Sequence, residues 1–111
     1  MGTLSTHVLD TSAGRPVRGL RISLADADGV LLGDGTTDAD GRIAAIGPER
    51  LPAGDYRLTF DTGAWFAGHG VTAFYPEVVV VFTIADTPDA DEHHHVPLLL
   101  SPFGYSTYRG T

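Results

Sequence analysis

The chain has 111 residues, with 14 acidic side chains against 7 basic ones, which gives a formal net charge of −7. That length suits one domain, so we expect residues 1–111 to form a single domain around one modest core. An acidic chain of this kind lacks the positive surface that binds nucleic acids or anionic membranes. The sequence has no Cys, and its seven basic residues are all Arg, which excludes disulfides, thiolate nucleophiles and Lys Schiff bases.

Apolar residues recur mainly with a period of two, and turn residues interrupt them about every eight to twelve positions, which is typical of an all-β fold. Long helical periodicity is absent from the sequence. The pattern predicts a β-sandwich of about eight strands. The expected strands are 4–10, 17–26, 29–36, 42–46, 54–61, 76–86, 92–100 and 103–109.

Turn residues support these boundaries. Asp28-Gly29 separates two alternating runs, as a tight hairpin turn would, and Asp40-Gly41 repeats the signal. Further along, the alternation of Tyr56, Leu58 and Phe60 places these three side chains on one face of a strand. We expect that face to belong to the core.

One segment departs from the strand pattern. Asp61 or Thr62 can cap a short helix, and Gly68 or Gly70 can end it. The sequence therefore predicts one helix near 62–69.

Two strands suggest contacts outside the single chain. The run Val78–Ile84 is apolar throughout, so we expect it to be buried on both faces, with another subunit as a possible outer cover. Pro97 lacks a backbone N–H, so the strand 92–100 is expected at a sheet edge or at a bulge. Because apolar edges are usually covered, we expect an oligomer interface here.

Histidine is the residue type in this sequence that best suits catalysis. Of the five His, three stand together at positions 93–95, and His7 lies in the first expected strand. On a strand, His93 and His95 share one face and His94 takes the other. Two imidazoles from neighbouring strands, with Arg42 nearby, could activate a water and neutralise a developing oxyanion.

The same residues have structural explanations, and spacing alone favours these over catalysis. A single strand His such as His7 is more often a hydrogen-bonded structural residue. The triplet at 93–95 can be a solvated loop end or can chelate a divalent metal such as zinc. The aromatic segment 103–111 suggests a docked terminus, which would make Arg109 and Thr111 available to line a site.

Four segments, in this order, resemble the 5-hydroxyisourate hydrolases, the purine-catabolic branch of the transthyretin-like proteins. They are LSTHVLDTSAGRP, TTDADGR, FDTGAWFAGHGVTAFYPEVVV and HHHVPLLLSPFGYSTYRGT. The closing YRGT tetrapeptide separates these hydrolases from the hormone-carrying transthyretins. One position departs from the family pattern, because His94 stands where the family commonly has an aromatic residue.

The resemblance implies a transthyretin-like, two-sheet antiparallel β-sandwich with one short helix. It also implies a homotetramer whose active sites lie at the dimer–dimer interface, without a metal or an organic cofactor. The family's catalytic set carries over to His7, Arg42 and His95. The substrate-binding positions carry over to Tyr108, Arg109, Gly110 and Thr111.

The activity implied by the resemblance is the hydrolytic opening of 5-hydroxyisourate to 2-oxo-4-hydroxy-4-carboxy-5-ureidoimidazoline, on the route from urate to allantoin. Either His7 or His95 would act as the general base while the other orients or shuttles a proton, and Arg42 would bind carbonyls and developing negative charge. Two other classes of protein compete with this one: a non-catalytic transthyretin-like binding protein and an immunoglobulin-like adhesion sandwich. Because the N-terminus shows no secretory signal, we expect a cytoplasmic protein that does not bind membranes.

Overall fold

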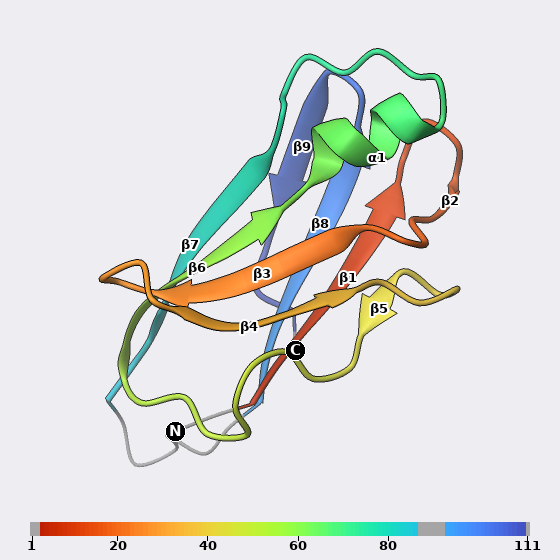
Figure 1. The fold of residues 1–111 in the computed structure, drawn as a ribbon. Coiled ribbons are helices and arrows are strands. Elements are labelled where there is room, and N and C mark those ends of the chain that lie inside the picture. The colour runs from red at the N-terminus through yellow and green to blue at the C-terminus, as the bar shows by residue number, and fades with distance from the viewer. Residues whose placement is uncertain (1–2, 87–92, 111) are drawn as a thin grey trace.

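The computed structural model describes residues 3–86 and 93–110, which form two β-sheets and one short helix (Figure 1). The first sheet contains β1 (Leu4–Asp10), β2 (Arg15–Pro16), β5 (Arg42–Ile43), β8 (His94–Ser101) and β9 (Gly104–Thr107). The second contains β3 (Arg21–Asp26), β4 (Leu31–Thr36), β6 (Gly54–Phe60) and β7 (Val78–Ile84). The helix α1 spans Thr62–Gly68.

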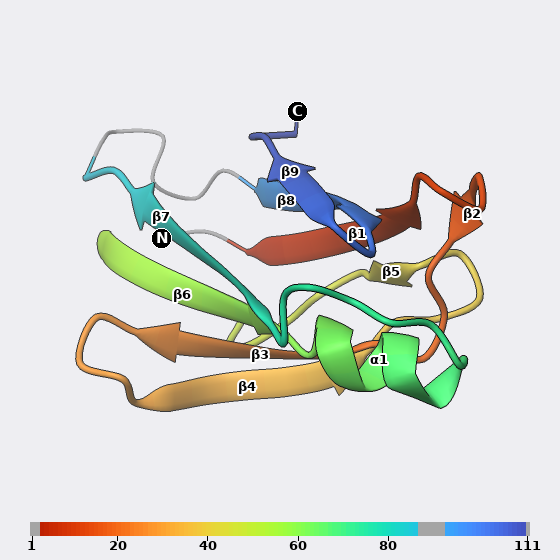
Figure 2. The same ribbon diagram turned by 90° about the horizontal axis from the view of Figure 1, so that it is seen from above.

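The two sheets form the layers of a sandwich, which Figure 2 shows from above. The strand order is β2-β1-β8-β9 in the first sheet, with β5 also paired to β1, and β4-β3-β6-β7 in the second. Neighbouring strands are antiparallel except β1 and β8, which run parallel with Leu4 opposite His94. The two-sheet β-sandwich expected from the sequence is therefore confirmed, with one parallel pair inside it.

The core lies between the inner faces of the two sheets. Leu58 and Phe60 of β6 and Leu98 of β8 are fully buried there, as the alternation of apolar residues along each strand requires. Burial of each such side chain contributes roughly 1.5–3 kcal/mol to the free energy of unfolding. The helix closes one end of the sandwich beside β2 (Figure 1). Its Phe66 is buried and belongs to the core.

The predicted turns and the predicted helix are confirmed. Gly41 has a φ of 76°, which favours glycine, and its carbonyl accepts a hydrogen bond from the Val8 N–H at 2.8 Å. This bond ties the Asp40-Gly41 turn to β1. Asp61 occupies the N-cap position of α1, but its side chain makes no capping hydrogen bond. Among the described residues, no helix is long and apolar enough to cross a lipid bilayer.

The strands differ from the expected ranges mainly at their ends. The described residues contain nine strands, because the short strand β2 was not expected, and most of the others are shorter than predicted. The expected strand 17–26 begins only at Arg21. Before it, the Leu20 N–H donates to the Thr37 hydroxyl instead of to a neighbouring strand.

The prediction for the strand that holds Pro97 was wrong, because β8 lies inside its sheet between β1 and β9. The Val96 carbonyl points towards β1, where it accepts a hydrogen bond from the Thr6 hydroxyl. The backbone nitrogen and carbonyl of the next residue, Pro97, therefore point towards the opposite neighbour, β9. There the Thr107 hydroxyl donates to the Pro97 carbonyl at 2.7 Å, at the end of the β8–β9 ladder. A proline is tolerated at position 97 because the β8–β9 pairing stops at Leu98, so no strand hydrogen bond from residue 97 is needed.

The expectation that Val78–Ile84 is buried on both faces does not hold within the single chain. β7 is the edge strand of the second sheet, and Val81 at its centre is 58% exposed. The apolar run reflects packing against the core on one side only.

Candidate active site

The predicted catalytic residues gather on the outer face of the first sheet. Side chains alternate along β1, so Ser5 and His7 point away from the core. In the parallel β1–β8 register Ser5 lies opposite His95, and in the β1–β5 register His7 lies opposite Arg42. Three strands therefore bring together side chains that lie up to 90 positions apart in the sequence.

A depression of about 360 Å³ opens on this face. Its volume falls within the range of roughly 300–1,000 Å³ that is usual for small-molecule sites. Its lining residues are Ser5, Thr6, Arg42, Ile43, Ala44, His93 and His95. It contains two of the three predicted catalytic side chains, while His7 lies beside it on β1.

His7 is held by the turn that precedes β5. Its Nε2 lies 2.9 Å from the carbonyl oxygen of Asp40. Because a carbonyl only accepts hydrogen bonds, Nε2 carries a proton in this contact, and Nδ1 is the basic nitrogen of the neutral ring. The Asp40-Gly41 turn thus positions His7 as well as Arg42.

The surroundings of His95 favour the neutral form of its ring. Its pKa lies below the usual value for histidine, chiefly because burial disfavours the charged ring, and further because the charges of Arg42, His7 and His93 repel it. A hydrogen bond to the Ser5 backbone acts in the opposite direction. A neutral imidazole can accept a proton, so His95 fits the role of a general base.

Ser5 was not singled out by sequence reasoning, yet its hydroxyl joins two of the histidines. Its Oγ lies 2.7 Å from Nδ1 of His95 and 2.7 Å from Nε2 of His93. The Thr3 hydroxyl is hydrogen-bonded to Nδ1 of the same His93. The spacing of the LST segment gives no hint of partners about 90 residues away.

The zinc alternative for the triplet 93–95 gains no support from this geometry. His93 and His95 share a face but are bridged by a hydroxyl, while His94 is buried on the inner side. Within residues 3–86 and 93–110, no group of three or more His, Asp or Glu could hold a metal ion.

The C-terminal segment lies directly against His95. The Gly110 N–H donates to the His95 carbonyl at 2.9 Å, which forms an isolated β-bridge. A Cβ at Gly110 would lie only 2.5 Å from Cδ2 of the His95 ring, so glycine is required for the chain to cross here. Thr111, also predicted at the site, lies outside the described residues.

Tyr108 and Arg109 do not line the depression that contains Arg42. They border a neighbouring depression of about 220 Å³, between the C-terminal segment and β7, to which His95 also contributes. His95 is therefore the residue that the two depressions share.

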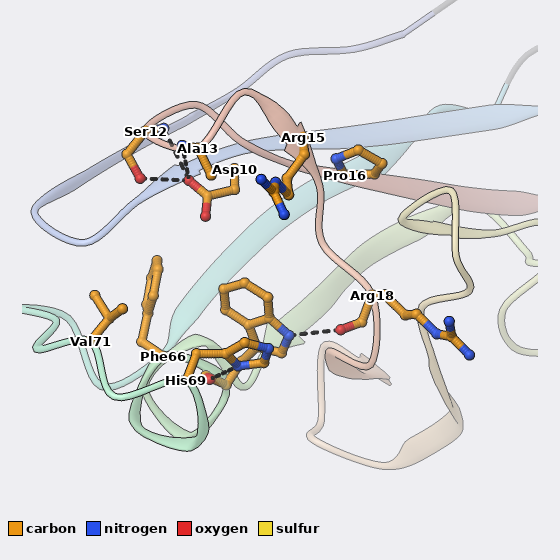
Figure 3. A pocket seen from close by; sticks show the side chains of 10 residues that line it. Asp10, Ser12, Ala13, Arg15, Pro16, Arg18, Phe66, His69 and Val71 are labelled. Atoms are coloured by element: carbon orange, nitrogen blue, oxygen red, sulfur yellow. Dashed lines mark hydrogen bonds between the residues drawn. The ribbon is translucent and has the colours of Figure 1, made fainter.

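A third depression, of about 420 Å³, lies at the other end of β1 beside α1 (Figure 3). Two of its polar side chains make structural bonds: the Trp65 Nε1–H donates to the Arg18 carbonyl at 2.7 Å, and the Ser12 hydroxyl donates to the Asp10 carboxylate at 2.6 Å. His69 stacks on Trp65, with ring centroids 4.1 Å apart. These contacts explain residues to which the sequence gave no function.

The fold and the site define a β-sandwich that carries two histidines and an arginine on the outer face of one sheet. Residues 4–110 match the sequence profile of the HIUase/Transthyretin family, and the chain belongs to this family.

Both branches of the family contain close relatives of the chain. It is 47% identical to the 5-hydroxyisourate hydrolase of Salmonella dublin over 112 residues, which cover 97% of this chain and 80% of the relative. The structure of 5-hydroxyisourate hydrolase from Klebsiella pneumoniae superposes with a TM-score of 0.89 at 45% identity, covering 98% of this chain and 99% of that one. Sea bream transthyretin in complex with thyroxine gives a TM-score of 0.86 at 34% identity, covering 97% and 94%.

Proposed function

We propose that the protein hydrolyses 5-hydroxyisourate and opens its six-membered ring to give 2-oxo-4-hydroxy-4-carboxy-5-ureidoimidazoline, a step in the conversion of urate to allantoin. The observation that carries this proposal is the grouping of His95, Arg42 and His7 on one sheet face, with a lowered pKa at His95. Relatives that are more than 40% identical over nearly the whole chain are named for this activity. The substrate is thus proposed from similarity, and the chemistry from the site.

In the proposed reaction His95 is the general base. It takes a proton from a water molecule while the water oxygen attacks the ring carbonyl carbon. Arg42 stabilises the negative charge that develops on the carbonyl oxygen, because its guanidinium offers several fixed N–H donors. As the C–N bond breaks, the imidazolium of His95 returns the proton to the departing nitrogen. His7, with its Nε2 held by Asp40, orients the water or substrate through Nδ1.

The C-terminal residues complete the proposed substrate site. Tyr108 and Arg109 border the depression next to that of Arg42, so they can hold the part of the substrate that extends past His95. Gly110 lets the chain pass close to the His95 ring. Thr111 belongs to the proposal on the basis of the family resemblance.

We also propose that the active form is a homotetramer with its sites at the dimer–dimer interface. Two features support this assembly: the site is an open depression in the single chain, and large aromatic side chains of β9 and the C-terminal segment that follows it are exposed. Tyr105 is 43% exposed and Tyr108 58%. Light scattering of the purified protein should give four times the mass of one chain, and a monomer with full activity would refute the proposed assembly.

The proposed chemistry uses only protein groups and water, so no metal or organic cofactor is required. Activity should therefore survive dialysis against EDTA, and a loss that zinc restores would favour a metal site at the triplet 93–95. We also propose a cytoplasmic location, which fractionation of the source cells would test.

The test of the function is to add the purified protein to 5-hydroxyisourate made freshly by urate oxidase and to follow the ultraviolet absorbance. Decay well above the spontaneous rate is expected. The alternative, a non-catalytic binding protein, is suggested by the similarity to a transthyretin in complex with thyroxine. Thyroxine binding by the same sample, without faster decay, would favour that alternative.

A further inference from the structure

A continuous chain of hydrogen bonds lies behind the proposed base. It runs from His95 to the Ser5 hydroxyl, from there to His93, and from His93 to the Thr3 hydroxyl. We call Thr3, Ser5 and His93 the relay. Ser5 is nearly buried, whereas His93 is exposed, so the relay leads from the site to the surface of the sheet.

If each group along this chain donates to the next one, two directions of donation are available. A serine hydroxyl has a single proton to donate, and each nitrogen of a neutral imidazole is either a donor or an acceptor. If His95 donates from Nδ1, Ser5 accepts and donates to Nε2 of His93, whose Nδ1–H then donates to Thr3. In the other direction Thr3 donates to Nδ1 of His93, and Nε2–H of His93 donates to Ser5. Ser5 then donates to Nδ1 of His95, which carries its own proton on Nε2.

The nitrogen of His95 that contacts Ser5 decides which tautomer the proposed reaction needs. Nδ1 lies 2.7 Å from the Ser5 Oγ, so Nε2 is the nitrogen that remains for a water molecule. Nε2 of a neutral imidazole accepts a proton only when Nδ1 carries the ring proton. The first direction, in which Nδ1–H of His95 donates to the Ser5 hydroxyl, is therefore the one that fits a general base.

We propose that Ser5 and His93 are positioning residues: the relay holds the proton of neutral His95 on Nδ1 and so leaves Nε2 as the basic nitrogen for the water. The kinetic part of this proposal rests on the proposed function. When His95 takes up a proton during the reaction, Nδ1–H keeps its acceptor, and every dipole of the relay is already oriented towards the positive ring. The relay therefore acts on the ring both before and after the proton transfer.

The other charged groups around His95 have a different effect. Arg42 from β5, His7 from β1 and Arg109 from the C-terminal segment face it, as does His93 within the relay. After burial, which is the largest cause, the charges of Arg42, His7 and His93 lower the pKa of His95. The contact that distinguishes its two nitrogens is the Ser5 hydroxyl at Nδ1.

The direct test is long-range ¹H–¹⁵N correlation NMR of the ¹⁵N-labelled full-length protein, above the pH at which His95 titrates. The spectrum should show His95 with its proton on Nδ1. Ser5→Ala should move the ring towards a mixture with the Nε2–H form, and Ser5→Thr, which keeps the hydroxyl, should restore the wild-type pattern. A wild-type His95 protonated on Nε2 would overturn the proposal, even if Ser5→Ala cannot be folded.

Kinetics supply the second measurement. Ser5→Ala should lower kcat about tenfold, the effect of losing one neutral hydrogen bond, with KM changed less than twofold. Ser5→Thr should recover most of the rate. The matched control is Ser23→Ala, which removes a half-buried serine hydroxyl from β3 in the other sheet and should leave kcat unchanged. Equal kcat in Ser5→Ala and wild type would refute the kinetic role.

The two measurements separate this proposal from the proposed function. If the wild-type protein does not accelerate the decay of 5-hydroxyisourate, the proposed function fails, while the NMR spectrum still tests the relay. If the protein is active but His95 has the same tautomer with and without the Ser5 hydroxyl, the relay fails and the hydrolase assignment stands.

Discussion

The substitution Gly110→Ala tests whether the close approach of the C-terminal segment to His95 matters for catalysis. The added Cβ would lie 2.5 Å from Cδ2, 3.1 Å from Cγ and 3.2 Å from Cβ of His95. Carbon atoms normally approach to about 3.5–4.0 Å, so the segment or the ring must move by about 1 Å. The backbone of Gly110 is not in the left-handed region, so the cost is purely steric.

His95 has little freedom to accommodate this change. Its ring is tied to Ser5 through Nδ1, and its carbonyl accepts the hydrogen bond from the Gly110 N–H. A displacement of about 1 Å at a reacting group can reduce the rate about 100-fold. We therefore expect kcat/KM for 5-hydroxyisourate to fall between 10-fold and 100-fold, with little change in melting temperature because the site is near the chain end.

The assay is the ultraviolet decay of 5-hydroxyisourate at equal concentrations of folded protein. Gly104→Ala is the matched control, because a Cβ there would meet only the Ser101 Oγ at an ordinary 3.6 Å in the same C-terminal hairpin. Its activity should equal that of the wild type. If Gly110→Ala is as active as Gly104→Ala, the reasoning from this contact is refuted.

Four other outcomes follow from the same geometry. Because burial, and then Arg42, lower the pKa of His95, the neutral base should persist below pH ~6.5, and kcat/KM should fall only as the pH drops through this lowered pKa. In Arg42→Ala the acid limb of the profile should move to higher pH, and an unmoved limb would contradict the assigned cause. His7→Ala and His95→Ala should each reduce kcat by about 100-fold or more with the oligomer unchanged by light scattering, whereas near-normal turnover in both would reject the histidine mechanism. Deletion of residues 108–111 should reduce activity far more than melting temperature, and an unfolded product would show instead that the segment is structural. Trp65→Phe, which loses the bond to the Arg18 carbonyl, should lower the free energy of unfolding by about 1 kcal/mol without changing kcat; a large kcat effect would give the depression beside α1 a catalytic role.

Local sequence signals predicted most of the fold. The turns at Asp28-Gly29 and Asp40-Gly41 and the core face of β6 follow from neighbouring residues, and the structure has them where expected. The position of β8 could not be found in this way, because it depends on which strand lies beside Pro97. The sequence showed that this residue lacks a donor, but not that the β9 ladder ends there.

The candidate site likewise contains residues that the sequence predicted and one, Ser5, that it did not. The resemblance placed His7, Arg42 and His95, and the register of three strands brings them to one face. Ser5 was missed because its role depends on the parallel pairing of β1 with β8, which joins residues 90 positions apart. The role of the Ser5 hydroxyl can be inferred only once its contacts with His93 and His95 are known.

The measurement that tests the central claim most directly compares wild-type protein with His95→Ala in the decay of freshly made 5-hydroxyisourate, at the same concentration of assembled protein. We predict rapid, catalytic decay with the wild type and a rate close to the spontaneous one with the variant. Decay at the spontaneous rate with both proteins would contradict the hydrolase assignment, and equally rapid decay with both would contradict His95 as the base.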